Sequence, residues 1–208
     1  QRGGRMIERL VFVRDDFMSV EECNALIEHY KHANNNGLVN EGVISKFGKT
    51  TTDSNLKCSS DWQIGRDNQY SQFLSALSKR LNRVIMEEFL SALSANAEFD
   101  ARCILNGTNT AYSTFQVQKY AADQGHFRSW HIENIGKRMA GRIFSILIYL
   151  NTLEEEMKGE TEFLLLERKI RPVAGKLLIH PAGYPFVHRG NKPCSSDKYV
   201  LISWLEYV

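Results

Sequence analysis

The sequence predicts an α+β protein that is mainly β, a sandwich or jelly roll backed by N-terminal helices. Three observations support this fold class. Two amphipathic helical stretches fall in the first half of the 208-residue chain. After residue 111, short β-rich runs follow one another with turn residues between them, and no helical pattern interrupts these runs. A long series of short strands is typical of folds in which two sheets pack together.

The N-terminal part begins with the apolar run ERLVFVRDDF (residues 8–17), which predicts a short strand and a turn. Ser19 and Glu22 then form the S-x-x-E pattern of a helix capping box. A helix over residues 20 to 33 is expected, because apolar side chains recur there with helical spacing at Cys23, Leu26, Ile27 and Tyr30.

A longer helix is predicted over residues 70 to 93. Its apolar stripe, which we expect to face the core, consists of Tyr70, Phe73, Leu74, Leu77, Leu81, Val84 and Ile85. The segment between the two helices is rich in Asn, Gly, Ser and Thr and has no strong periodicity. Residues 34–61 are therefore predicted to be a mobile loop, which is either a lid over a bound chain or plain disorder.

The second half of the chain contains the predicted strands. The run GRIFSILIYLN (residues 141–151) is almost continuously apolar and is expected to be a central strand. The other predicted strands lie in residues 112–120, 160–167, 175–180 and 198–208. No repeat or linker divides the chain, so we predict one domain over residues 6–208, with residues 1–5 as a short tail or cloning remnant.

Composition limits the classes of partner. A net charge of +2 is too small to favour nucleic acid or an anionic membrane. Neither a membrane-spanning apolar run nor a leader peptide is found, and the four scattered cysteines are typical of reduced thiols. We therefore expect a cytoplasmic protein without a nucleic-acid or membrane partner, and the oligomeric state stays open.

His131, Glu133 and His188 are the candidate metal ligands. Two neutral imidazoles and one carboxylate form the facial set that holds non-haem iron(II) and leaves positions open for other ligands. Residues i and i+2 of a strand point the same way, so His131 and Glu133 can reach one ion, while His188 has to come from a neighbouring strand. Taken alone, the pattern also fits a surface His–Glu pair, and His126 is a competing ligand.

The order of motifs after residue 111 changes this balance. The motifs are Tyr120, Gly125-His126-Phe127, His131-x-Glu133, Tyr149-Leu150-Asn151, Gly159-Glu160-Thr161-Glu162-Phe163, Pro172-x-x-Gly175, His188-Arg189-Gly190, Lys198 and Trp204. This ordered set resembles the prolyl-hydroxylase-type branch of the iron(II)/2-oxoglutarate dioxygenases, whose core is a double-stranded β-helix. Two departures are Glu133, where most relatives carry Asp, and a longer spacing between Tyr120 and His131.

The resemblance implies iron(II) at His131, Glu133 and His188, with 2-oxoglutarate and O2 as cosubstrates and ascorbate as a candidate addition. It also implies that Lys198 pairs with the far carboxylate of 2-oxoglutarate, with hydrogen bonds from Tyr149 and Thr161. Otherwise Lys198 is a strand-end lysine that reaches solvent and Tyr149 is a core residue. Trp204 is expected to pack behind the metal ligands. Candidate substrate contacts are Tyr120, Arg128, Trp130 and Arg142, although exposed arginines are in general only solvated.

By the same resemblance, the expected reaction is hydroxylation of an unactivated C–H bond, with succinate and CO2 as co-products. The expected substrate is a prolyl residue in a peptide or protein. The alternatives are a free amino acid or another small molecule, and a jelly-roll binding module without catalytic activity. A nucleic-acid demethylase of the same superfamily is disfavoured, because that branch typically carries two arginines after the second histidine, and here Lys198 takes the place of the first.

Overall fold

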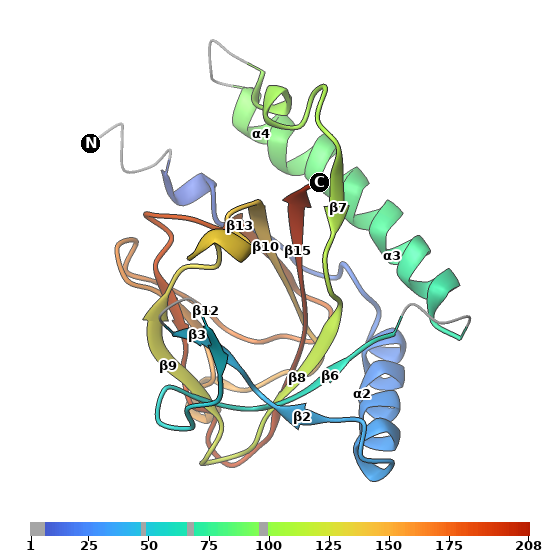
Figure 1. The fold of residues 1–208 in the computed structure, drawn as a ribbon, viewed down its shortest axis with the longest axis vertical. Coiled ribbons are helices and arrows are strands. Elements are labelled where there is room, and N and C mark those ends of the chain that lie inside the picture. Colours follow the sequence, from blue (N-terminus) through green and yellow to red (C-terminus); the bar gives the residue numbers. More distant parts are fainter. Residues whose placement is uncertain (1–6, 47–48, 66–68, 96–99) are drawn as a thin grey trace.

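The structure is a computed structural model that describes residues 7–46, 49–65, 69–95 and 100–208. The expected tail at residues 1–5 lies outside the described residues. Two antiparallel sheets face each other, and helices cover the outer face of the larger one (Figure 1). The predicted architecture, mainly β with two packed sheets and N-terminal helices, is confirmed.

The larger sheet has the order β1-β13-β10-β15-β8-β6-β2, and β7 pairs with β15. Its strands are β1 (Phe12–Arg14), β13 (Leu177–Pro181), β10 (Arg142–Tyr149), β15 (Lys198–Tyr207), β8 (Gln116–Tyr120), β6 (Ser60–Gln63), β2 (Asn40–Glu41) and β7 (Thr110–Tyr112). The smaller sheet has the order β12-β11-β14-β9-β5, made of Arg168–Ile170, Thr161–Phe163, His188–Gly190, His126–His131 and Lys57–Cys58.

One face of strand β15 packs against the helix-side hydrophobic core, and its other face lines the space between the two sheets. Its odd-numbered residues Tyr199, Leu201 and Leu205 pack in the same apolar cluster as the helices. Its even-numbered residues Lys198, Val200, Ile202 and Trp204 line a cavity between the sheets. Because side chains alternate along a strand, one face of β15 packs against the helices while the other face supplies a row of cavity residues.

The helices agree with the sequence pattern. Helix α2 (Val20–Asn35) begins at Ser19, and both hydrogen bonds of its capping box are present. Helix α3 (Ser71–Arg83) continues through a π-helical stretch, η1 (Val84–Leu90), into α4 (Ser91–Ser94). The continuous apolar stripe favoured one regular helix over this region, so the π stretch was not foreseen. Short 3-10 turns are η2 (Ala101–Ile104), η3 (Lys137–Met139) and η4 (Glu155–Met157).

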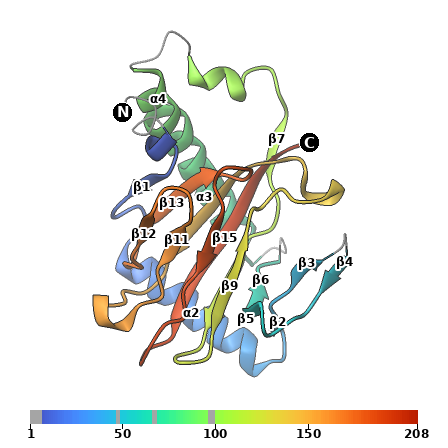
Figure 2. The ribbon, with the colours of Figure 1, turned by 90° about the vertical axis from the view of Figure 1, so that its left-hand side faces the viewer.

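The described residues of segment 34–61, which was predicted to be a mobile loop, contain several short strands. Strands β2 and β6 extend the larger sheet, and β5 extends the smaller one. Strands β3 (Ile44–Lys46) and β4 (Lys49–Thr51) form a hairpin that stands beside these sheet edges (Figure 2). The strands have only two to four residues each, too few to produce a recognisable alternation of polar and apolar side chains.

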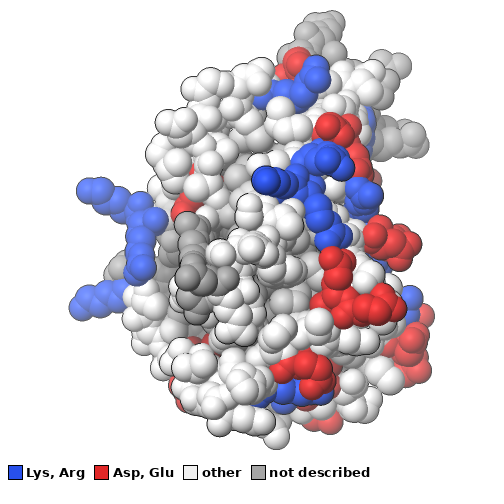
Figure 3. All heavy atoms as spheres, turned by 90° about the vertical axis from the view of Figure 1, so that its right-hand side faces the viewer, with Lys and Arg blue, Asp and Glu red and all other residues white. Residues whose placement is uncertain are grey.

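The surface is mixed in charge on the side that carries α2 and α3. Groups of Lys and Arg there lie next to groups of Asp and Glu, and large areas are uncharged (Figure 3). This face therefore does not present a field of one sign. None of the described helices is both long and apolar enough to cross a membrane.

The close approach of Gly175 to Met18 can be tested by substitution. Its φ is +80°, and a Cβ atom there would lie 2.0 Å from the carbonyl oxygen of Met18. We expect Gly175→Ala to lower the free energy of unfolding by about 3 kcal/mol, from backbone strain together with the displaced contact. Urea unfolding measures this change.

The matched control is Gly37→Ala, because Gly37 has a φ of +68° but no atom within 4 Å of an added Cβ. It should cost only about 1 kcal/mol. Equal losses at the two positions would contradict a role for the close approach to Met18.

Candidate metal centre

Two histidines meet because β9 pairs with β14. His131 is the last residue of β9, His188 is the first residue of β14, and the two lie opposite each other in the antiparallel register. Their ring centroids are 4.4 Å apart. The expectation that His188 reaches the pair from a neighbouring strand is confirmed.

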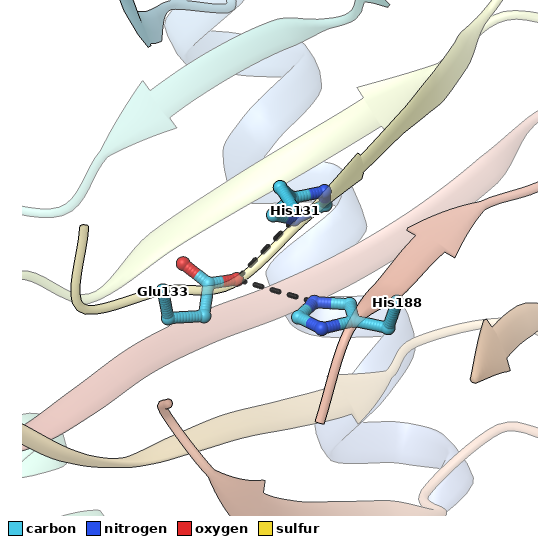
Figure 4. A group of neighbouring side chains, drawn as sticks. All are labelled: His131, Glu133 and His188. Carbon is cyan, nitrogen blue, oxygen red and sulfur yellow. Dashed lines mark ion pairs between the residues drawn. The ribbon is translucent and has the colours of Figure 1, made fainter. Parts of the chain in front are cut away.

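Glu133 completes the group from the turn that follows β9. Its Oε1 atom lies 3.6 Å from Nε2 of His131 and 3.4 Å from Nε2 of His188. One ligand atom from each residue falls within 4.8 Å of the others, and Figure 4 shows the three side chains pointing toward one another. The backbone N–H of Glu133 donates to the carbonyl of Ala182 at 2.7 Å, which ties this turn to the end of β13.

The backbone selects the tautomer of both imidazoles. Nδ1 of His131 lies 2.8 Å from the carbonyl oxygen of Ser129, and Nδ1 of His188 lies 3.0 Å from that of Phe186. A carbonyl only accepts hydrogen bonds, so each Nδ1 carries the proton. Both Nε2 lone pairs are then free for a metal ion, because histidines that bind metal commonly donate their other ring N–H to a backbone carbonyl.

The protonation states suit a divalent cation. Burial acts to raise the pKa of Glu133, but its interaction with the nearby His131 and His188 rings outweighs burial and holds that pKa well below its usual range. Burial, with the neighbouring His188, lowers the pKa of His131. An anionic carboxylate beside a neutral imidazole is the form in which these residues bind metal. Two imidazoles and one carboxylate, with room beside them, fit iron(II).

The second carboxylate oxygen of Glu133 has partners of its own. The indole Nε1 of Trp204 donates to Oε2 at 3.0 Å, and Nη1 of Arg142 lies 3.5 Å from the same atom. Arg142 also donates to the backbone carbonyl of Glu133 at 3.1 Å. Trp204 therefore lies behind the ligands as predicted, whereas Arg142, expected to contact substrate, holds a ligand residue.

Lys198 begins β15 at the opposite end of the row from Trp204. It is buried, and its Nζ lies 5.4 Å from the ring centroid of Tyr120 and 5.5 Å from that of Tyr149. The hydroxyl of Tyr149 donates to Oγ1 of Thr161 at 2.6 Å. The structure thus brings together Lys198, Tyr149 and Thr161, the three residues expected to bind the far carboxylate of a cosubstrate.

Lys198 is a buried cation without a close counterion among the described residues. No carboxylate in the described part of the chain lies within ion-pair distance of its Nζ. Burial lowers the pKa of Lys198 to about 8, against a weaker opposing effect of Glu160. A buried, unpaired ammonium is costly, and a bound anion would remove most of that cost. This end of the cavity therefore favours a carboxylate ligand.

One cavity of about 810 Å³ joins the two ends of the site. Its lining includes all three metal ligands together with Lys198, Thr161, Tyr120, Arg142 and Trp204. Tyr149 does not line the cavity and lies behind Thr161. A volume of this size is near the upper end of the range for small-molecule sites, so it has space for a cosubstrate and part of a second molecule.

Two of the residues proposed as substrate contacts lie elsewhere. Arg128 and Trp130 are not among the residues that line the cavity, whereas Phe127, Ser129 and His131 are. Alternation along β9 explains this, since even-numbered residues point to the other face of the strand. Arg128 is exposed and donates to the carbonyl of Asn55, and Trp130 packs under Arg189. This placement argues against direct substrate contact. The competing ligand His126 also lies outside the metal group.

Two contributors to the site were given no role from the sequence, although Phe127 belongs to one of the ordered motifs. Phe127 stacks on the His131 ring with centroids 3.8 Å apart, and Gln118 accepts a hydrogen bond from Tyr120 at 2.8 Å. Both follow from strand parity, because Phe127 is four residues before His131 and Gln118 is two residues before Tyr120. Once a ligand is assigned to a strand, its i±2 and i±4 neighbours are candidates for the same surface.

A comparison with protein families finds a match in the C-terminal part of the chain. Residues 115–206 match the model of the 2OG-Fe(II) oxygenase superfamily. The matched segment contains His131, Glu133, His188 and Lys198. The superfamily resemblance drawn from the ordered motifs is thereby confirmed.

Similar folds occur in solved structures of prolyl hydroxylases. A Trichoplax adhaerens prolyl hydroxylase in complex with a hypoxia inducible factor peptide fragment has a TM-score of 0.71 at 17% identity, with 99% of this chain and 89% of that chain covered. A Pseudomonas putida prolyl-4-hydroxylase gives 0.68 at 16%, covering 97% of both chains. A viral collagen prolyl hydroxylase from Paramecium Bursaria Chlorella virus-1 gives 0.63 at 20%, covering 96% and 97%. At these identities the comparison establishes the double-stranded β-helix fold.

The ligand assignment predicts a graded loss of metal binding. His131→Ala and His188→Ala should each weaken Co(II) binding by more than about 100-fold, and Glu133→Ala should weaken it by roughly 10- to 100-fold. In the wild type, affinity should fall as pH drops through the histidine range, since protonated imidazole cannot bind metal. Anaerobic titration measures each constant. His126→Ala is the control, and a comparable loss there would contradict the assignment.

The pKa of Lys198 predicts how affinity for 2-oxoglutarate depends on pH. Since burial places that pKa at about 8, the lysine is charged below this pH and loses its proton above it. Affinity should therefore be level below pH 8 and fall above it, by at most roughly tenfold per pH unit. Calorimetric titration of protein loaded with Mn(II) measures the profile. Lys198→Arg should abolish the decline, because arginine stays charged. A profile that is the same in both proteins would refute this role.

Proposed function

Since residues 115–206 match the 2OG-Fe(II) oxygenase superfamily, we propose that this protein is an iron(II)- and 2-oxoglutarate-dependent hydroxylase. It would convert an unactivated C–H bond to C–OH while 2-oxoglutarate and O2 become succinate and CO2. One observation carries the proposal: the His131–Glu133–His188 set and the buried Lys198 line the same cavity.

His131, Glu133 and His188 would hold the iron through two Nε2 atoms and one carboxylate oxygen. Bound iron(II), together with 2-oxoglutarate and O2, supplies the oxidising power for hydroxylation. The protein would supply three ligands, which leaves coordination positions for the cosubstrate and oxygen. Phe127 covers one face of the His131 ring and restricts its rotation.

Lys198 and Thr161 would bind the far carboxylate of 2-oxoglutarate. Tyr149 already donates to the Thr161 hydroxyl oxygen, so the hydroxyl hydrogen of Thr161 is free to donate to the cosubstrate. Tyr149 would therefore act through Thr161, as a positioning residue. A fixed cation and an oriented hydroxyl give the buried carboxylate the partners that it needs.

A prolyl residue in a peptide or protein is our proposed substrate. The three similar structures described above are named as prolyl hydroxylases, and one of them is a complex with a peptide fragment. The cavity supports a chain-like substrate, because it extends from the metal ligands to the β3–β4 hairpin and to Lys137–Met139. Tyr120 remains a candidate contact, since it lines this cavity.

The working environment is part of the proposal. All four cysteines are free, which supports a reducing compartment such as the cytoplasm. We propose ascorbate as a reductant that keeps the iron ferrous, a single domain over residues 6–208, and no nucleic-acid partner.

Turnover of 2-oxoglutarate tests the proposed function. Wild-type protein with iron(II), ascorbate and proline-containing peptides should release succinate, and a peptide should gain the mass of one oxygen atom. His188→Ala, the matched control, should do neither. Oxidation of free proline or another small molecule would redirect the substrate assignment. Failure of the wild type to take up metal or form succinate would favour a binding module without catalytic activity.

A further inference from the structure

Glu133 is held at both of its carboxylate oxygens. Oε1 faces the two histidines, while Oε2 faces away from them and meets the Trp204 indole at 3.0 Å. Arg142 reaches the same Oε2 at 3.5 Å. Among the described residues, Oε1 therefore lies next to the two histidines, and Oε2 contacts Trp204 and Arg142.

The two donors also hold each other. The guanidinium carbon of Arg142 lies 3.7 Å from the ring centroid of Trp204, a close cation–π stack. Both residues come from neighbouring strands, β10 and β15, so their positions depend on the central ladder of the larger sheet. Neither donor is on a flexible loop.

An irregularity in β10 directs Arg142 toward Glu133. In a regular strand Arg142 would share a face with Phe144, whose side chain is buried in the helix-facing cluster. The β10–β15 register shifts between these two residues, and Arg142 instead lines the cavity. Bulges commonly redirect a side chain near an active site. The backbone therefore departs from its ladder at the position where a donor to Glu133 is supplied.

We propose that Arg142 and Trp204 form a clamp that adapts this metal centre to a glutamate ligand. This proposal rests on the proposed function. A glutamate is longer than an aspartate by one carbon–carbon bond, about 1.5 Å, and has one more rotatable bond. Without restraint it could turn away or present both oxygens to the metal. The clamp binds Oε2, so that Glu133 presents Oε1 alone and the remaining metal positions stay open.

The proposed clamp predicts a different effect of Trp204 when aspartate replaces Glu133. In Glu133→Asp the carboxylate is drawn back toward the backbone, away from the Trp204 indole. Loss of the indole N–H should then have little further effect. A purely structural role of Trp204 would instead weaken metal binding to the same extent with either ligand.

A double-mutant cycle tests the clamp with four proteins: wild type, Glu133→Asp, Trp204→Phe and the double variant. Anaerobic Co(II) titration gives the affinities, and the Co(II) absorption spectrum reports coordination number. With Glu133, Trp204→Phe should weaken Co(II) binding about tenfold and change the spectrum. In the Glu133→Asp background, the effect of Trp204→Phe should be less than about twofold.

A second cycle with Arg142→Gln keeps the test informative if the core substitution at Trp204 impairs folding, since the side chain of Arg142 is partly exposed. Arg142 carries a positive charge near the metal, but its repulsion is present with both ligands and cancels in the coupling. Trp62→Phe, in the helix-facing cluster, is the control and should leave Co(II) affinity unchanged.

The outcomes separate the two proposals. Equal fold-changes with glutamate and aspartate in both cycles, with wild-type metal binding intact, would overturn the clamp and leave the proposed function standing. Absence of Co(II) binding by the wild type would overturn both. A spectrum that stays the same in Trp204→Phe, together with unchanged affinity, would also overturn the clamp.

Discussion

The site depends on the pairing of β9 with β14. This register sets His131 opposite His188, so one ladder joins two residues far apart in the sequence. A shift of one residue would turn one imidazole to the other face of its strand, and the metal group would be lost. Carbonyls within the same two segments then orient both rings. Position and tautomer therefore have the same origin, the local backbone of the smaller sheet.

The cavity has charged groups at its two ends, and their burial lowers the stability of the folded protein. Glu133 is an anion at one end, and Lys198 is a buried cation without a close carboxylate among the described residues at the other. His180 packs against His188, its buried Nε2 has no hydrogen-bond partner among the described residues, and burial lowers its pKa to about 3. Such groups reduce stability by about 1–3 kcal/mol each when they stay unpaired. A metal ion and a dicarboxylate offset the charge part of this cost on binding, so ligand affinity and apo stability are linked.

The sequence was most informative where one physical pattern dominates. The capping box at Ser19 marks a helix start through local hydrogen bonds, and the apolar stripe of α3 reports burial directly. The ligand residues are recognisable because chemistry restricts their type. Features that depend on distant partners were missed. The strands within 34–61 are edge pieces that take their order from β8 and β9, and the redirection of Arg142 comes from a register shift that no local composition encodes. Arg128 and Trp130 lie outside the cavity lining, a placement that strand parity indicates once it is applied beyond the ligands.

The candidate metal ligands and part of the cavity lining belong to different parts of the chain. The superfamily match covers residues 115–206, yet Val43, Ile44, Lys46 and Leu56 line the same cavity from outside that region. A buried network joins the two parts: Lys57 pairs with Asp61 at 2.9 Å, Asp61 accepts from Gln118, and Gln118 accepts from Tyr120 beside Lys198. Because removing one partner of a buried ion pair is strongly destabilising, we expect this network to hold the N-terminal lining residues in place next to Lys198. Residues outside the matched region therefore contribute part of the lining of the cavity that contains His131, Glu133 and His188.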